Sequence, residues 1–70
     1  MEGESVTTIA KWDLAFSKKA AIKDIEYDSG MHLLRMTIRE GTRITDVNLH
    51  AEAAKEIGEM MVKWAEMNKV

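Results

Sequence analysis

The stretch Asp28-Ser-Gly-Met-His-Leu-Leu-Arg-Met-Thr-Ile-Arg-Glu-Gly-Thr-Arg43 decides the fold of this chain. Apolar and polar residues alternate along its centre, the apolar ones being Leu34, Met36 and Ile38 and the polar ones Arg35, Thr37 and Arg39. A period of two residues is that of a β-strand, so the two sets lie on opposite faces of a sheet. Asp28-Ser-Gly30 at one end and Glu40-Gly-Thr42 at the other are typical of turns, because Asp bonds the nearby backbone and Gly adopts positive φ. The stretch therefore predicts a long strand, residues 31–39, between two tight turns.

Residues 20–28 and 43–49 form the strands predicted on either side of it. In the first of these strands, Ile22 breaks the alternation of apolar and polar residues. In the second, the apolar residues on either side of Thr45-Asp46 are out of phase. One extra residue in a strand restores the phase, so we expect a β-bulge or the start of the strand near Ile22 and a β-bulge near Thr45-Asp46.

The first segment of the chain, residues 6–16, fits two structures. Alternate residues from Val6 to Phe16 are largely apolar, which is typical of a strand, whereas Ile9, Trp12 and Phe16 also fit the stripe of a helix. The β-branched run at the start of the segment favours the strand.

Residues 51–67 have the pattern of an amphipathic helix. The apolar residues fall within about a third of a turn on a helical wheel. They are Ala53, Ala54, Ile57, Met60, Met61 and Trp64. Charged residues take the other side, where Lys55 and Glu59 are spaced for an ion pair, and Val62 lies among them, about 140° from the centre of the stripe. We expect the stripe to clamp the helix onto the core.

Strands linked by hairpins and followed by one helix make an α+β arrangement. We expect a three- to four-stranded antiparallel sheet, a meander, followed by one C-terminal amphipathic helix packed on one face. The opposite face would carry Met31, Leu33, Arg35, Thr37 and Arg39. That face is half apolar and half basic, so a ligand or a second subunit would bind there.

The length of 70 residues makes one domain, which we place at residues 6–70 after a flexible polar tail of residues 1–5. A domain of this size buries only about 60% of the surface of its unfolded chain, and disulfides, metals or a second subunit commonly support it. The chain has no cysteine, and its two histidines do not make a zinc site. Of these three supports, a second subunit is the one left, so we expect a homodimer, with a compact monomer as the alternative.

The charge and hydropathy of the chain exclude several classes of protein. A formal net charge of −2 is not the charge of a duplex-DNA-binding domain, which is strongly basic. No apolar run approaches the ~20 residues of a membrane helix. The N-terminus lacks the basic start and apolar core of a signal peptide. We therefore expect a cytoplasmic protein with no membrane partner.

The sequence contains no catalytic or cofactor motif. His32 and His50 stand without a Ser, Cys or second His at motif spacing, and His32 lies on the apolar phase of its strand, where we expect a buried or half-buried structural histidine. Asp24, Glu26 and Asp28 repeat on one strand face, where a solvated surface is more common than a cation site. No glycine-rich phosphate loop is present. We therefore expect no enzyme, no cofactor and no metal.

Arginines are the candidate binding residues. Arg35, Arg39 and Arg43 converge if the long strand pairs with the next one through the turn at Gly41, and Lys23 lies on a neighbouring strand. Arginines spaced by two on a strand can track phosphates, and their planar groups stack on bases. The alternative is a set of surface arginines balanced by carboxylates across the strands.

The chain resembles two families. It resembles a family of small uncharacterised bacterial proteins from about residue 12 to residue 65, on the segments Tyr27-Asp-Ser-Gly-Met31, Leu34-Arg35-Met36, Ile38-Arg-Glu-Gly-Thr-Arg43, Leu49 and Trp64-Ala65. That resemblance implies a short domain without an assigned activity. In architecture the chain also resembles the positive-cofactor-four type of single-stranded DNA-binding domain, over about residues 20–64, on Ile38-Arg39-Glu40 and on Val47-Asn-Leu49 running into the helix. This second resemblance implies four strands and a helix, dimerisation through helices and single-strand binding on curved sheets, although the chain lacks the dense lysines and aromatics of such sheets.

Two functions from different classes follow from these features. The first is a non-enzymatic module that binds single-stranded nucleic acid on a sheet face through Arg35, Arg39, Arg43 and Lys23. The second is an accessory protein whose helix or sheet face docks onto a protein partner. Nucleic-acid binding weakens steeply with salt, whereas docking through an apolar patch does not.

Overall fold

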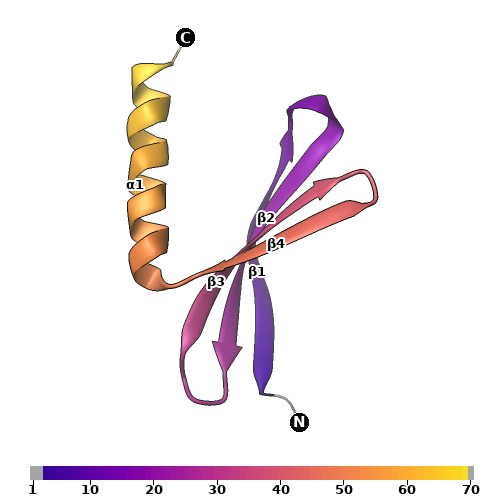
Figure 1. Ribbon diagram of the computed structural model, residues 1–70, viewed down its shortest axis with the longest axis vertical. Helices are drawn as coiled ribbons and strands as arrows, with labels where there is room; N and C mark the ends of the chain where they lie inside the picture. The colour runs from indigo at the N-terminus through magenta and orange to yellow at the C-terminus, as the bar shows by residue number, and fades with distance from the viewer. Residues whose placement is uncertain (1–2, 70) are drawn as a thin grey trace.

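The computed structural model describes residues 3–69 as one antiparallel sheet followed by one helix (Figure 1). In chain order the elements are β1 (Glu4–Leu14), the single 3-10 turn η1 (Ala15–Ser17), β2 (Lys18–Tyr27), β3 (His32–Glu40), β4 (Arg43–Leu49) and α1 (Ala51–Met67). The strands lie in the order β1-β2-β3-β4, so each pairs with its neighbour in the sequence. The predicted fold class is confirmed, with four strands in the meander.

The segment with two interpretations is a strand. Residues 6–16 belong mostly to β1, which begins at Glu4 because Glu4 pairs with Tyr27 of β2. The predicted tail of residues 1–5 therefore loses its last two residues to the sheet. Residues 1–2 of that tail lie outside the part of the chain that the structure describes.

A β-bulge interrupts the pairing of β1 with β2. The register shifts between Thr8 and Ala10, so Ile9 is the extra residue. Ala10 pairs with Ile22, which places the bulge across from Ile22 in β1 rather than within β2. Within β2 the alternation is broken because Ile22 and Ile25 lie on opposite faces of the sheet, since the register of β2 with β3 has no shift.

The pairing of β3 with β4 is regular throughout. Met36 lies opposite Val47, and the register continues without a shift on both sides of this pair. The bulge predicted at Thr45-Asp46 is therefore wrong. Ile44 and Val47 differ in phase because they lie on opposite faces of the sheet, and both faces carry apolar residues.

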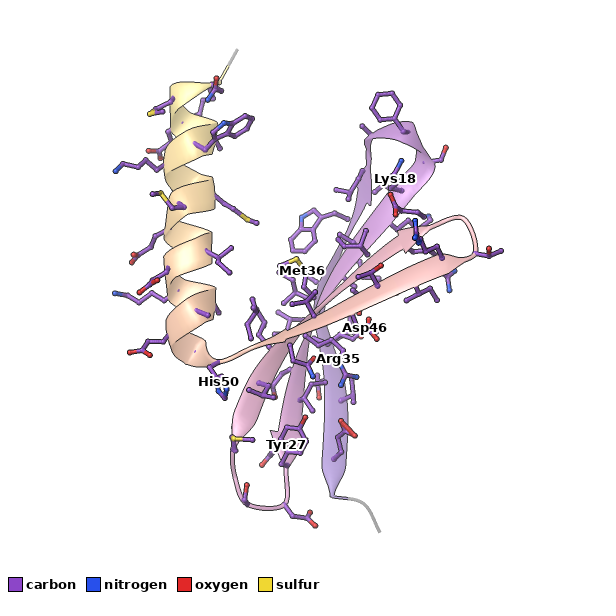
Figure 2. All side chains as sticks on the ribbon, in the orientation of Figure 1. Lys18, Tyr27, Arg35, Met36, Asp46 and His50 are labelled. Carbon is purple, nitrogen blue, oxygen red and sulfur yellow. The ribbon has the colours of Figure 1, made fainter. Side chains whose placement is uncertain are left out.

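The sheet has one face toward α1 and one face away from it, which we call the helix-side face and the outer face. Met36 lies between the sheet and α1, whereas Arg35 and Asp46 lie on the other side (Figure 2). Side chains directly opposite each other on paired strands share a face, so the register assigns the others. The helix-side face carries Ala10, Trp12, Leu14, Ile22, Ile38, Val47 and Leu49. The outer face carries Lys11, Lys19, Lys23, Ile25, Leu33, Thr37 and Arg39.

The buried core of a single chain is small. Ile25 is the one buried hydrophobic side chain among residues 3–69, with an exposed fraction of 0%. It lies on the outer face between Val6 of β1 and Leu33 of β3. Ile25 therefore holds the three strands β1, β2 and β3 together at one end of the sheet.

The helix α1 meets the sheet near its first turns and then stands apart from it (Figure 1). Ala53 and Ala54 are half-buried at that contact. Further along the same stripe, Ile57 is 39% exposed and Trp64 is 64% exposed. Within one chain the predicted clamp is therefore limited to the start of the helix.

Replacement of Ile25 should destabilise the fold far more than the same replacement elsewhere on the outer face. We expect Ile25→Ala to lower the free energy of unfolding by about 2–4 kcal/mol, because it removes a buried side chain and leaves a cavity. Ile44→Ala is the matched control, since Ile44 is 53% exposed and surface changes of this kind cost under about 1 kcal/mol. Urea unfolding followed by circular dichroism measures both, and equal losses would contradict this account of the core.

Candidate functional site

Basic side chains from three neighbouring strands gather on the outer face. Lys19 lies directly opposite Arg39, and Lys23 lies directly opposite Arg35. Lys11 of β1 lies next to this quartet, opposite Ala21. We call these residues the basic cluster: Lys11, Lys19, Lys23, Arg35 and Arg39. Like charges directly opposite each other destabilise a sheet, so the sheet holds two unfavourable pairs side by side.

Four members of the basic cluster, all except Arg35, line a depression over β1, β2 and β3. Ala21 and Thr37 lie opposite each other between the two like-charged pairs, and the small side chain of Ala21 leaves the centre open. The depression has a volume of about 550 Å³, within the range of about 300–1,000 Å³ for ligand sites. Its lining is formed by Thr8, Lys11, Trp12, Asp13, Lys19, Ala20, Ala21, Lys23, Thr37 and Arg39. An anion placed there would meet cations from β1, β2 and β3 and one carboxylate, that of Asp13.

Two members of the basic cluster are held by neighbouring side chains. Arg35 donates from Nε to Asn48 Oδ1 at 2.9 Å, and its Nη2 lies 3.6 Å from Glu4 Oε2. Lys19 Nζ lies 3.1 Å from Asp13 Oδ1. Lys19 and Asp13 line the depression, whereas Arg35 and Glu4 do not. Each ion pair orients its cation and neutralises part of the charge.

The remaining members are available to a ligand. Lys11, Lys23 and Arg39 form no ion pair with a carboxylate among residues 3–69. The carboxylate nearest to the middle of the sheet on this face, Asp46, accepts a hydrogen bond of 2.7 Å from Thr37 Oγ1. The hydroxyl of Thr37 is therefore committed to Asp46, and the three cations are left to attract an anion.

The structure brings together three of the four predicted binding residues. Lys23, Arg35 and Arg39 lie on the outer face, as expected. Arg43 does not join them, because the two-residue turn after Glu40 places Arg43 directly opposite Glu40, on the helix-side face. The predicted convergence of the arginines is therefore wrong for Arg43.

Sequence reasoning missed two lysines of the basic cluster, Lys11 and Lys19. The position of Lys19 follows from the register of β2 with β3. The position of Lys11 follows from the register of β1 with β2, which depends on the bulge at Ile9. The alternation within each strand was present in the sequence. It could not assign the face, because a shift of one residue moves a whole strand to the opposite face.

The turn between β1 and β2 presents a second feature that the sequence did not indicate. Phe16 is 88% exposed at its tip, and Phe16 and Ser17 both have positive φ, 61° and 60°. Such backbone angles are uncommon for residues with a side chain. Lys18 Nζ lies 5.8 Å from the centre of the Phe16 ring, within the range of a cation–π contact. An exposed ring at a tight turn can stack on a planar group.

Charge is segregated between the sheet and the helix. The strand residues of the outer face comprise the five cations of the basic cluster and three carboxylates, Glu4, Asp13 and Asp46. In α1 the balance is reversed, with Glu52, Glu56, Glu59 and Glu66 against Lys55 and Lys63. The net charge of −2 therefore conceals a basic outer face.

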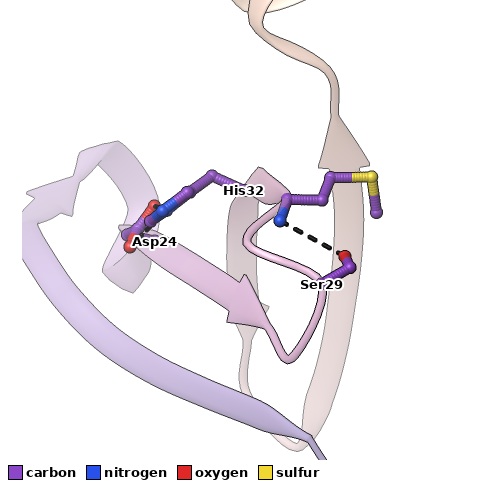
Figure 3. A network of polar contacts seen from close by, with 4 residues as sticks. Asp24, Ser29 and His32 are labelled. Carbon is purple, nitrogen blue, oxygen red and sulfur yellow. Dashed lines mark hydrogen bonds and ion pairs between the residues drawn. The ribbon is translucent and has the colours of Figure 1, made fainter.

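A separate polar pair lies at the edge of the helix-side face. His32 Nδ1 lies 2.9 Å and 3.1 Å from the two carboxylate oxygens of Asp24 (Figure 3). The His32 side chain is 53% exposed, so it is more exposed than predicted. The hydrogen bond to Asp24 raises the pKa of His32 above 6.5, and the charges of Asp24 and Glu26 add to that increase. His32 therefore ties β3 to β2 most strongly when it is protonated.

Among residues 3–69, no three His, Cys, Asp or Glu side chains form a group that could hold a metal ion. Over the same residues, α1 falls short of the length and apolar content that a membrane-crossing helix needs.

The His32–Asp24 pair should make stability depend on pH. Because folding raises the pKa of His32, its stabilising effect is complete below pH 6.5 and is lost as the pH rises through the folded pKa. We expect a proton NMR titration to give a His32 pKa above 6.5, and Asp24→Asn to lower it. The difference in unfolding free energy between the parent and Asp24→Asn should shrink between pH 6 and pH 8. A His32 pKa at or below 6.5 would contradict the pairing.

Comparison with known proteins places the chain in a family. Residues 3–67 match the family described as "Family of unknown function (DUF6967)". The predicted resemblance to a family of small uncharacterised proteins is thereby confirmed, and the matched residues include the whole basic cluster. No curated protein and no solved structure matches the chain. The chain, matched from the start of β1 to the end of α1, belongs to the DUF6967 family of unknown function.

Proposed function

We propose that this protein is a non-enzymatic binding module that holds single-stranded nucleic acid on the outer face of its sheet. The observation that carries the proposal is the pair of like-charged contacts across β2 and β3, Lys19 with Arg39 and Lys23 with Arg35. Like charges directly opposite each other destabilise a sheet, and the ion pairs of Lys19 with Asp13 and of Arg35 with Glu4 offset part of this repulsion. A bound phosphate backbone would remove this repulsion, because it places negative charge between the cations.

The shape of the basic cluster favours a flexible strand over a duplex. Lys19 and Lys23 are four residues apart on β2, which is about 13 Å along a strand, and Arg35 and Arg39 are spaced in the same way on β3. A strip of this length can contact successive phosphates of a single strand. Duplex binding needs a strongly basic domain, and the net charge of this chain is −2.

Two further features support this class of ligand. The exposed Phe16 ring offers a surface on which a base can stack. The architectural resemblance to positive-cofactor-four domains, drawn from the sequence, points to the same ligand. The alternative function, docking onto a protein partner, is supported by a different surface, the exposed apolar residues on the helix side.

Binding to a fluorescently labelled oligo-dT strand should be detectable by anisotropy at low salt. We expect micromolar affinity at best near physiological salt, since only a few phosphate contacts are available. The logarithm of affinity should fall with the logarithm of salt concentration, with a slope of about −0.7 for each phosphate contact. The double variant Lys23→Gln/Arg39→Gln should bind at least about tenfold more weakly, and its salt slope should be smaller by about 1.4.

The matched control is Arg43→Gln, which removes a positive charge from the helix-side face. Its affinity should stay within about twofold of the parent, because non-specific attraction by a distant charge is screened by salt. Equal loss in the control and the double variant would show that net charge, and not the outer face, governs binding. No anisotropy change for the parent at low salt would overturn the proposed function and favour protein docking.

A further inference from the structure

Apolar side chains are exposed on both sides of the space between α1 and the sheet. On the sheet, Trp12 and Val47 of the helix-side face are each 48% exposed. On the helix, Met60, Met61 and Trp64 are 62%, 56% and 64% exposed. The stripe of α1 and the helix-side face are therefore two apolar surfaces that a single chain leaves uncovered.

The amount of uncovered surface is large for a chain of this mass. The exposed area is 5774 Å² for 7.9 kDa, whereas a compact monomer of that mass exposes about 4,400 Å². The radius of gyration is 14.0 Å, against about 11 Å for a compact chain of this length. The excess of roughly 1,400 Å² exceeds the ~800 Å² that each partner buries in a standard interface, and reaches the range of obligate dimers.

We propose that a second copy of this chain covers these surfaces in a two-fold symmetric dimer. Among residues 3–69, Ile25 is the one buried hydrophobic side chain, so a partner would supply most of the buried core. Such a partner has to be present whenever the chain folds. A second copy meets that condition. Each copy also offers both a helix stripe and a sheet face, so two copies can cover each other by the same contacts, as an isologous interface requires.

The centre of the stripe indicates how the two helices meet. Met60 and Met61 lie at the centre of the stripe, with Ile57 about one turn before them and Trp64 about one turn after them. In an antiparallel pair that crosses at Met60 and Met61, Ile57 of one copy lies beside Trp64 of the other. The helix-side faces then lie inside the dimer and the outer faces point outward. This inference does not depend on the proposed function.

Light scattering after size exclusion, at tens of micromolar protein, tests the dimer directly. We expect a mass of twice the 7.9 kDa of one chain. Both tryptophans, Trp12 and Trp64, lie on the proposed interface, so the dimer should emit at shorter wavelength than free tryptophan and the emission should shift to longer wavelength on dilution. A folded species with the mass of one chain overturns the proposal and leaves these surfaces for a different protein.

Two substitutions on α1 test the surface. Ile57→Asp places a charge in the stripe and should weaken dimerisation at least tenfold, whereas Val62→Asp places the same charge on the opposite side of the helix and should leave the mass unchanged. A dimer that survives Ile57→Asp and is lost with Val62→Asp would overturn the proposed surface.

Because Ile57→Asp could also prevent folding, cysteine cross-linking provides a second measurement. The chain has no cysteine, so a single introduced thiol reports on its own position. Met61→Cys should form a disulfide-linked dimer under mild oxidation, since a disulfide needs Cα atoms within about 7 Å. Val62→Cys should remain uncoupled. Linkage at Val62 without linkage at Met61 would place the contact on another face of the helix and overturn the proposal.

Discussion

The uninterrupted register between β2 and β3 is the constraint on which the rest of the structure depends. It places Ile25 opposite Leu33, which builds the small core on the outer face. The same register sets Lys23 opposite Arg35, so the repulsion within the basic cluster is a direct consequence of the pairing that makes the core. A shift of one residue would bury charge and expose Ile25, because alternate side chains would exchange faces. The core and the candidate binding face are therefore fixed by one set of backbone hydrogen bonds.

The two faces of the sheet meet opposite physical demands. The outer face tolerates like charges because it is open to water, and water screens them. The helix-side face carries apolar residues that a single helix does not cover, since α1 meets the sheet near its first turns and then stands apart from it (Figure 1). Charge on one face and uncovered apolar surface on the other are both unfavourable in an isolated chain. Both would be relieved by binding, by an anion on the outer face and by a second copy on the helix side.

The sequence predicted the elements that depend on local chemistry. The last strand and the helix have the predicted bounds, 43–49 and 51–67, since a two-residue turn and a 3.6-residue period are both local signals. What it did not predict depends on pairing between distant segments. Arg43 lies away from Arg39 because of how the hairpin closes, and Lys11 joins the basic cluster through the bulge at Ile9. The exposure of Trp64 could not be predicted. An apolar stripe on a helix indicates that the stripe packs against another surface, but it does not indicate whether that surface belongs to the same chain.

The separation of charge between sheet and helix links the two proposals in one geometry. The helix α1 carries four glutamates and two lysines and is therefore acidic, whereas the outer face of the sheet is basic. A dimer that buries the helix stripes leaves the charged sides of both helices in water and turns both basic faces outward. An anionic strand that approaches such a dimer would be attracted to either outer face and repelled by the acidic helices between them. Regions of opposite potential on one protein surface steer a charged ligand in this way. The acidic net charge of the chain is therefore compatible with an anionic ligand, because it lies on a different element from the cations that would bind it.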